Sequence, residues 1–234
     1  MFEIEQVRRL GAHGHTILDI GANIGTTSIP RIHQGHFLRA VVAEPSQVDF
    51  RCLVRNIVTN ELRGHILPER SAIYSRTGTV RFVEAAQSGV HRVSGKDKGD
   101  EVPSFRLDDW LDRREITPAL VDFVKCDAQG AEGHILEGAE ALLARRRAIW
   151  QIEYWPKGLT APGTTESALQ DLLHRWFSHF ILLGRRGDGQ EDLTAYPLTA
   201  LADAMASLEL GPRGFTNLLL YPTTRAAIRG SVST

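Results

Sequence analysis

Short apolar runs alternate along the chain with longer segments in which apolar residues recur at helical spacing. Four of these runs, at 16–20, 40–44, 121–124 and 148–154, are bounded by glycine or polar residues. Such runs are typical of strands that are buried on both faces of a sheet. Strands that alternate with helices predict a mostly parallel, doubly wound α/β sheet.

The remaining elements follow from the same periodicity and from the turn residues between them. Further strands are expected at 65–74 (with its exit loop), 79–83, 180–183 and 217–221. Helices are expected at 1–14, 25–33, 47–61, 131–145, 165–177 and 199–208. Ser46 and Asp108 are expected to cap the helices that begin at these positions. We therefore expect one domain over 1–234, with a core at about 15–222 and a frayed end at 224–234.

The first apolar run ends in a glycine turn. Gly21 and Gly25 remove side chains where the backbone bends sharply and where a ligand can approach it. The first amides of the following helix point back at this loop and line a polar pocket. The next strand ends in Glu44, at about the distance where nucleotide-binding folds place an acid for the ribose hydroxyls. A carboxylate suits that position because it accepts hydrogen bonds from both hydroxyls.

The spacing of the two glycines distinguishes between nucleotides. A dinucleotide fingerprint is G-x-G-x-x-G, whereas this chain has Gly21-x-x-x-Gly25 preceded by Asp19. An acid at this turn is unfavourable beside a pyrophosphate but favourable beside a cationic ligand, such as the sulfonium and ammonium of S-adenosylmethionine. An NAD-dependent oxidoreductase, which would share the same strand, glycine turn, helix and acid, is therefore the less favoured interpretation.

The composition is that of an ordinary globular protein. The chain has 234 residues, 42% hydrophobic and 24% charged, with a net charge of −1. It lacks the basic excess of a nucleic-acid binder and any apolar run near the roughly 20 residues that span a bilayer. The N-terminus does not resemble a signal peptide, and the two cysteines have no metal-binding spacing. We therefore expect a cytoplasmic protein with neither a nucleic acid nor a membrane as its partner.

Four motifs in a fixed order give the chain a resemblance to a known family. They are Asp-Ile-Gly-Ala-Asn-Ile-Gly (19–25), Ala-Glu-Pro-Ser (43–46), Leu-Asp-Asp (107–109) and Val-Asp-Phe-Val-Lys-Cys-Asp-Ala-Gln-Gly-Ala-Glu (121–132). Together they resemble the FkbM family of S-adenosylmethionine-dependent methyltransferases. The resemblance implies a Rossmann-like, seven-stranded methyltransferase sheet whose last strand is antiparallel. It also implies an O-methyltransferase of EC 2.1.1 type that converts S-adenosylmethionine to S-adenosylhomocysteine. Its acceptor would be a hydroxyl of a small molecule, such as a sugar or a polyketide-like natural product.

The cofactor is expected at the carboxyl ends of the strands. The loop from Gly21 to Gly25 would hold the methionine end, Glu44 the ribose, and Ser71 with Ala72 the adenine. Ordinary strand-to-loop chemistry explains Ser71 and Ala72 equally well. The full set of expected cofactor-binding residues is Asp19, Gly21, Ala22, Asn23, Gly25, Glu44, Pro45, Ser71, Ala72 and Asp127.

Methyl transfer from a sulfonium requires an aligned acceptor oxygen and a group that takes its proton. Asp127 follows a strand on the same rim, and His91 lies in the polar, glycine-rich segment 84–104, so both are candidates for the catalytic base. The acceptor substrate is expected to contact His91, Arg92, Glu153, Tyr154 and Trp155. No metal is expected, because no set of carboxylates or histidines is predicted to converge on one point.

Gln129 departs from the motif of the family, which usually has Asp-Val-Glu-Gly-Ala-Glu where this chain has Asp-Ala-Gln-Gly-Ala-Glu. The glutamine keeps the shape of the expected glutamate but not its charge, so cofactor or substrate binding should be weaker or differently selective. This leaves a second hypothesis, a non-catalytic S-adenosylmethionine-binding module or a partner subunit of an active homologue. A homodimer is possible if the apolar C-terminal strand is an exposed edge.

Overall fold

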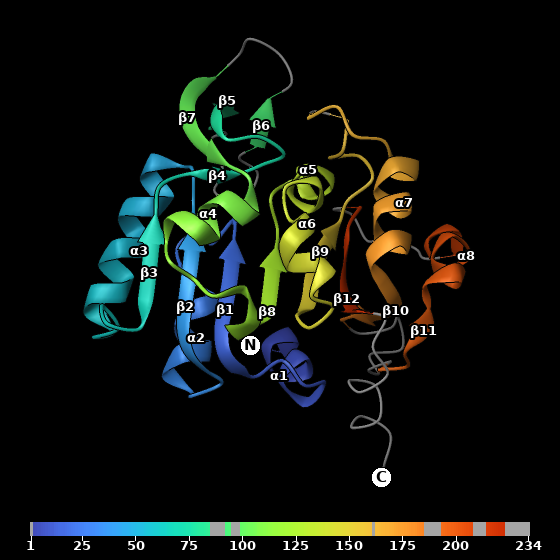
Figure 1. Cartoon of the computed structure of the whole chain (residues 1–234), viewed down its shortest axis with the longest axis horizontal. Coiled ribbons are helices and arrows are strands. Elements are labelled where there is room, and N and C mark those ends of the chain that lie inside the picture. The colour runs from blue at the N-terminus through green and yellow to red at the C-terminus, as the bar shows by residue number, and fades with distance from the viewer. Residues whose placement is uncertain are drawn as a thin grey trace.

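The centre of the protein is a twisted sheet of eight strands. The computed structural model describes residues 2–84, 92–94, 99–160, 162–184, 193–207 and 214–222. In chain order the strands are β1 (Gly14–Ile20), β2 (Phe37–Ala43), β3 (Ile66–Glu69), β8 (Val121–Cys126), β9 (Ile149–Tyr154), β10 (Phe177–Leu183), β11 (Tyr196–Pro197) and β12 (Thr216–Pro222). They lie in the spatial order β11-β10-β12-β9-β8-β1-β2-β3 (Figure 1).

The direction of the strands agrees with the predicted mostly parallel sheet. Strands β3, β2, β1, β8 and β9 pair in parallel, whereas β12 is antiparallel to both of its neighbours, β9 and β10. The predicted number of seven strands is wrong, because β11 pairs antiparallel with β10 as an eighth. This strand has two residues, too few for a detectable alternation, and Pro197 suits an edge because it has no N–H to donate.

Helices cover both faces of the sheet. They are α1 (Phe2–Arg9), α2 (Ser28–His33), α3 (Gln47–Thr59), α4 (Leu107–Arg113), α5 (Glu132–Glu137), α6 (Glu140–Ala144), α7 (Glu166–Trp176) and α8 (Leu201–Ser207), with 3-10 turns η1 (Pro118–Leu120) and η2 (Leu198–Ala200). Buried residues of α1–α3 belong to one apolar cluster, and those of α4–α8 belong to the other. The fold is therefore the predicted Rossmann-like arrangement of helix, sheet and helix layers. No helix in the described ranges has the length and apolar character needed to cross a membrane.

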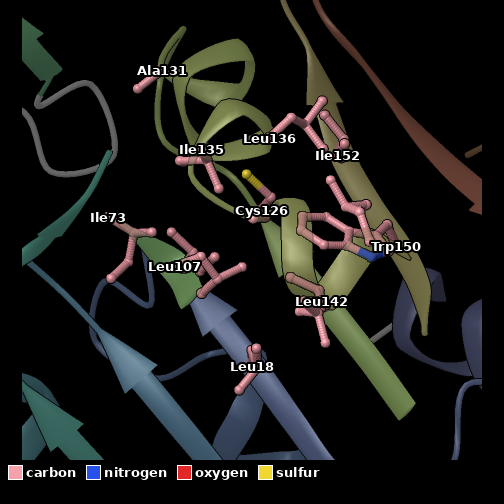
Figure 2. Packing of buried hydrophobic residues seen from close by; sticks show 14 of the residues in the cluster. Leu18, Ile73, Leu107, Cys126, Ala131, Ile135, Leu136, Leu142, Trp150 and Ile152 are labelled. Atoms are coloured by element: carbon pink, nitrogen blue, oxygen red, sulfur yellow. The ribbon is translucent and has the colours of Figure 1, made fainter. Parts of the chain in front are cut away.

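The two apolar clusters follow the alternation of side chains along each strand. Ile17 of β1 is in the cluster beneath α1–α3, and its neighbour Leu18 is in the opposite cluster. Figure 2 shows Leu18 and Trp150, from β1 and β9, together with Leu136 of α5 and Leu142 of α6. All of these side chains are buried, so both faces of the central strands are desolvated.

A second, smaller sheet contains β4 (Ala72–Ile73), β5 (Gly78–Val83), β6 (Arg92–Ser94) and β7 (Asp100–Phe105), in the order β4-β7-β5-β6. It stands beyond the carboxyl ends of β1–β3 (Figure 1). The polar, glycine-rich segment 84–104, for which the sequence predicts no strand, contains β6 and most of β7, which pair with β5. The mostly polar sequence of β7 gives no pattern from which a strand can be predicted, since Val102 is the one buried apolar residue of this strand.

The helix boundaries differ from the predicted ones at two glycines. The first helix begins at Ser28 rather than Gly25, because Gly25 has φ +91°, outside the helical region. The segment 131–145 is interrupted at Gly138, where a Cβ atom would lie 2.4 Å from the carbonyl oxygen of Tyr74. α5 ends before Gly138, its C-cap residue, and α6 begins at Glu140, so the chain forms two short helices instead of one.

The two predicted caps have different outcomes. Ser46 caps α3 as predicted, because its hydroxyl oxygen accepts a hydrogen bond from the amide of Asp49 at 3.3 Å. Asp108 does not cap its own helix. Its carboxylate instead accepts hydrogen bonds from the amides of Ala141 at 2.8 Å and Leu142 at 3.0 Å, and so caps α6. This contact fixes α4 against α6 on one face of the sheet.

Candidate cofactor and active site

A cavity of about 260 Å³ opens at the carboxyl ends of the parallel strands, between the main sheet and the small sheet. Its walls come from the glycine loop after β1, the ends of β2 and β8, and strands β4–β6. Most of the residues predicted to bind the cofactor line it: Gly21, Ala22, Asn23, Glu44, Pro45, Ser71, Ala72 and Asp127. Ligands of open α/β sheets bind at this rim, so the cavity is the candidate site.

The glycine loop places its backbone directly against the end of β8. Gly21 has φ +74°, and a Cβ atom there would lie 1.9 Å from the carbonyl oxygen of Asp127. The amides of Gly21 and Ala22 donate to the carbonyl of Ala43, which ties the loop to the end of β2. Glycine at position 21 is therefore required both by the backbone conformation and by the closeness of the two loops.

Glu44 is held by the loop that it faces. One carboxylate oxygen accepts a hydrogen bond from the Asn23 amide at 2.8 Å, and the other accepts one from the Ser46 amide at 2.8 Å. Burial raises the pKa of Glu44 to about 7, although these two hydrogen bonds oppose the rise. Each carboxylate oxygen has a second lone pair, so Glu44 can accept two further hydrogen bonds from a ligand.

Lys125 joins the glycine loop to two acids. Its ammonium donates to the carbonyl of Gly21 at 3.0 Å and lies 3.2 Å from Asp127 Oδ2 and 3.5 Å from Asp19 Oδ1. Burial would lower the pKa of Lys125, but the Asp127 and Asp19 carboxylates outweigh burial and raise it. Lys125 is therefore a permanent cation at the wall of the cavity.

The position of Lys125 corrects the expected role of Asp19. Asp19 is fully buried and does not line the cavity. Lys125 lies beside it, because the two residues are register partners on the adjacent strands β1 and β8. The cation that the sequence leads us to expect beside Asp19 is thus a side chain of the protein. Asp127 is the acid that remains open to a ligand at this end of the cavity.

A group of acids surrounds the loop that follows Asp127. Gln129 donates through Nε2 to Asp127 Oδ1 at 3.0 Å and to Glu153 Oε2 at 3.1 Å. Glu132 accepts a hydrogen bond from the Ala128 amide at 2.8 Å. Burial, with the Asp127 and Glu132 carboxylates nearby, raises the pKa of Glu153 to about 9. Burial also raises the pKa of Glu132 to about 7.

These raised pKa values predict that the protein is less stable in mild alkali. Glu44, Glu132 and Glu153 bind protons in the folded state up to pH 7–9, whereas unfolded glutamate releases its proton near pH 4.5. The folded state binds more protons in this interval, so the free energy of unfolding falls as pH rises. We expect a loss of at least about 2 kcal/mol between pH 6 and 9, or about 4–8 °C in melting temperature.

Thermal melting of a Glu153→Gln variant tests this expectation. The glutamine can still accept the hydrogen bond from Gln129 but does not titrate, so the dependence on pH should become clearly shallower. Glu140→Gln, an exposed change on α6, is the control and should melt like the wild type at every pH. A wild-type melting temperature that stays constant or rises from pH 6 to 9 would contradict the argument.

The other end of the cavity is mainly apolar. Ile73 and Phe82 contribute side chains from the small sheet, and Val93 of β6 lies beside them on the wall. Ser71 is fully buried there, and its hydroxyl has no hydrogen-bond partner among the described residues. A flat heteroaromatic ligand would fit such a wall, with Ser71 available for one hydrogen bond.

Several residues expected at the site lie elsewhere. Gly25 packs against Leu53, away from the cavity lining. Tyr154 faces the opposite side of β9 from Glu153 because side chains alternate along a strand, and its hydroxyl donates to Glu166 at 2.7 Å. Glu153 reaches the site through its contact with Gln129.

The other substrate residues expected from the sequence are placed only in part. Trp155 is half-buried, does not line the cavity, and lies against Gly158, where a Cβ atom would be 2.2 Å from its ring. His91 lies outside the described residues, and Arg92 is placed through its backbone pairing with Val83. Within the described ranges, no group of three or more histidine, cysteine or acidic side chains is arranged to hold a metal ion.

Reasoning from the sequence missed part of the lining. The residues concerned are Ile20, Thr26, Thr27, Ala43, Asp49, Ile73, Phe82, Val93, Lys125, Ala128 and Ala131. Lys125 sits directly before the end of an apolar strand, so the rule that ligands bind at strand ends could have identified it. Asp49 gave a weaker signal as an acid in the first turn of a helix, where it accepts a hydrogen bond from the Asn23 side chain at 2.9 Å.

The family of the chain follows from a family model. The model of the methyltransferase FkbM domain matches residues 19–172, about two thirds of the sequence. The chain therefore belongs to the FkbM methyltransferase family. Membership confirms the resemblance and S-adenosylmethionine as the cofactor. A search among curated proteins finds no match.

Solved structures with a similar fold include several methyltransferases. Methyltransferase FkbM from Methylobacillus flagellatus KT has 16% sequence identity and a TM-score of 0.52, over 90% of this chain and 44% of that one. The tRNA methyltransferase TrmK of B. subtilis has 12% identity and a TM-score of 0.49, over 99% and 70% of the two chains. TrmK of M. capricolum, solved with S-adenosylhomocysteine, has 12% identity and a TM-score of 0.46, over 96% and 69%. This chain spans less than half of the length of the Methylobacillus protein. The likeness between the two structures supports the fold alone.

Proposed function

We propose that the protein is an S-adenosylmethionine-dependent O-methyltransferase that acts on a hydroxyl group of a small molecule. The observation that carries this proposal is one cavity with an apolar wall at one end, the Glu44 carboxylate beside the glycine loop, and the Asp127 carboxylate beside Lys125 at the other end. A nucleoside that bears an amino acid has hydroxyl groups at its centre and a cationic group at its far end, so its polarity matches this arrangement.

The residues of the cavity fit the three parts of the cofactor. Glu44 accepts hydrogen bonds from the ribose hydroxyls, and Ser71, Ile73 and Phe82 surround the adenine. Gly21 lets the backbone approach the methionine portion, whose ammonium is held by Asp127. When bound, S-adenosylmethionine supplies an electrophilic methyl group on a positively charged sulfur.

The remaining task of the protein is to align an acceptor oxygen and to remove its proton. Alignment is the larger contribution, since well-oriented reactions gain about 7–11 kcal/mol, whereas a general base contributes about 10²–10⁴-fold. Asp127 is already paired with Lys125 and Gln129, an arrangement that suits a cation better than an incoming proton. We therefore assign Asp127 to the cofactor and leave His91 as the proposed proton acceptor.

Calorimetric titration with S-adenosylhomocysteine and, separately, with NAD tests the cofactor. We expect a dissociation constant on the order of micromolar for S-adenosylhomocysteine and no heat of binding with NAD. The acceptor is then sought by mass spectrometry, with sugars and polyketide-like alcohols incubated with S-adenosylmethionine. The gain of one methyl group on an oxygen would support the proposal.

A non-catalytic module is the second candidate function, favoured by the neutral Gln129 in the middle of the acidic group. Binding of S-adenosylhomocysteine without methyl transfer to any acceptor would favour this alternative. Absence of S-adenosylhomocysteine binding would contradict both candidates. A homodimer and a cytoplasmic location stay predictions from the sequence.

A further inference from the structure

Gln129 occupies a strained position at the cavity wall. Its backbone has φ +54°, a left-handed conformation that is uncommon for residues other than glycine. The next residue, Gly130, packs so closely on the loop 155–159 that a Cβ atom would lie 2.2 Å from the carbonyl oxygen of Gly158. A strained backbone conformation of this kind persists only where contacts with the surrounding structure hold it in place. Such conformations are concentrated at functional sites. The backbone therefore fixes where the side chain of Gln129 can reach.

The side chain of Gln129 bridges two carboxyl groups. Its Nε2 atom lies 3.0 Å from Asp127 Oδ1 and 3.1 Å from Glu153 Oε2. Glu153 is 4% exposed and belongs to β9, so it offers a rigid anchor, whereas Asp127 belongs to a loop. The second oxygen of Asp127 faces Lys125 at 3.2 Å. Gln129 and Lys125 thus hold Asp127 from two sides.

An amide is the one uncharged side-chain group that can form this bridge with a single atom. The NH₂ group carries two hydrogens and can donate one to each carboxyl group. A glutamic acid at this position has one hydrogen and can satisfy one of the two, and a glutamate has none. The glutamate expected from the resemblance would therefore lose at least one hydrogen bond and, once ionised, would meet two further carboxyl groups.

A neutral glutamine at position 129, in place of a glutamate, also affects the net charge of the site. Gln129 contacts the carboxyl groups of Asp127 and Glu153, and the titratable groups that interact with these two are Lys125, Cys126 and Glu132. Lys157, on the loop that packs against Gly130, is exposed. Lys125 balances one of the two aspartates beside it, which leaves one net negative charge on Asp19, Lys125 and Asp127. One net charge of this sign matches a ligand with a cationic end.

We propose that Gln129 is a positioning residue whose amide, anchored on Glu153, holds the Asp127 carboxylate at the cavity for the cationic end of the cofactor. This inference rests on the proposed function, because it assigns the ligand of Asp127. It also reverses the expectation from the sequence that Gln129 weakens the site. In this chain the glutamine is part of the binding arrangement.

Calorimetric titration of S-adenosylhomocysteine at pH 6, 7, 8 and 9 tests the inference with Gln129→Glu and Gln129→Met. We express each result as the dissociation constant of the variant divided by that of the wild type at the same pH. For Gln129→Glu this ratio should exceed about 10 at pH 8 and fall towards pH 6, where the introduced carboxyl group regains a proton to donate. For Gln129→Met, which has no donor and no charge, the ratio should be raised equally at every pH.

The controls separate this inference from a general effect on folding. Gln34→Glu adds the same charge at an exposed residue after α2 and should give a ratio near one at every pH. If Gln129→Glu does not fold, Gln129→Met alone decides the question: wild-type affinity in that variant would overturn the inference. A ratio for Gln129→Glu that stays within about threefold of one at all four pH values would also overturn it. Failure of the wild type itself to bind S-adenosylhomocysteine would instead overturn the proposed function, and the inference with it.

Discussion

Glu44→Ala is expected to weaken the binding of S-adenosylhomocysteine at least about 100-fold, because a hydrogen bond to a charged group contributes about 1.5–3 kcal/mol and two ribose hydroxyls lose their acceptor. The substitution also frees the amides of Asn23 and Ser46, which hold the glycine loop and the start of α3 in place. Calorimetric titration measures the effect directly.

Two further measurements make this prediction specific to the carboxylate. Glu44→Gln should also bind weakly, because its NH₂ group would face the N–H of either Asn23 or Ser46. The pKa of Glu44 is about 7, so the affinity of the wild type should fall as pH drops from 8 to 6, when this acceptor is protonated. Glu140→Ala, on the exposed side of α6, serves as the control. Tight binding to Glu44→Ala would rule out Glu44 as the ribose contact.

Gly21→Ala is expected to lower both stability and cofactor affinity. The new Cβ atom would lie 1.9 Å from the carbonyl oxygen of Asp127, and the backbone has φ +74°. Left-handed strain costs about 1–2 kcal/mol and overpacking against backbone about 1–3 kcal/mol, so the total is about 3 kcal/mol. In a domain of this size the melting temperature should fall by about 6–12 °C. Because Asp127 must move, binding of S-adenosylhomocysteine should weaken at least about tenfold.

Gly35→Ala is a matched control for the strain alone. Gly35 has φ +70°, almost the same as Gly21, but no atom lies within 4 Å of the position of its Cβ. We expect a loss of about 1 kcal/mol, about 2–4 °C in melting temperature, with cofactor affinity unchanged. Equal effects of the two substitutions would show that the closeness of Gly21 to Asp127 is unimportant.

The parts of the fold that the sequence predicts best are those in which one local signal is strong. The buried strands β1, β2, β8 and β9 read as apolar runs, and the Ser46 cap follows from a single residue type before a helix. Glu44 at the end of β2 follows from the same logic of strand ends. These features depend on residues close together in the chain, which is why periodicity and turn chemistry are enough.

The parts that the sequence does not predict depend on neighbours in space. Lys125 is brought to Asp19 by the pairing of β1 with β8, strands separated by about 100 residues. In the small sheet, the strand predicted at 79–83 is β5, but β6 and β7 have too few apolar positions to be recognised before they pair with it. The prediction that Tyr154 contacts the substrate together with Glu153 fails for a different reason. Neighbouring side chains of a strand point to opposite faces, so the alternation along β9 already separates these two residues.

The position of β12 has a consequence for how the protein is made. β12, the last of the described strands, lies inside the sheet, between β9 and β10, which come earlier in the sequence (Figure 1). About 60 residues separate the end of β9 from the start of β12, so at about 5–20 residues per second the ribosome needs about 3–12 s to bridge them. Throughout this interval β9 presents an unpaired edge with Trp150 and Ile152 beside it, a target for chaperones and for other nascent chains. By contrast, β1 and β2, the two strands that hold the glycine loop, are both made long before β12.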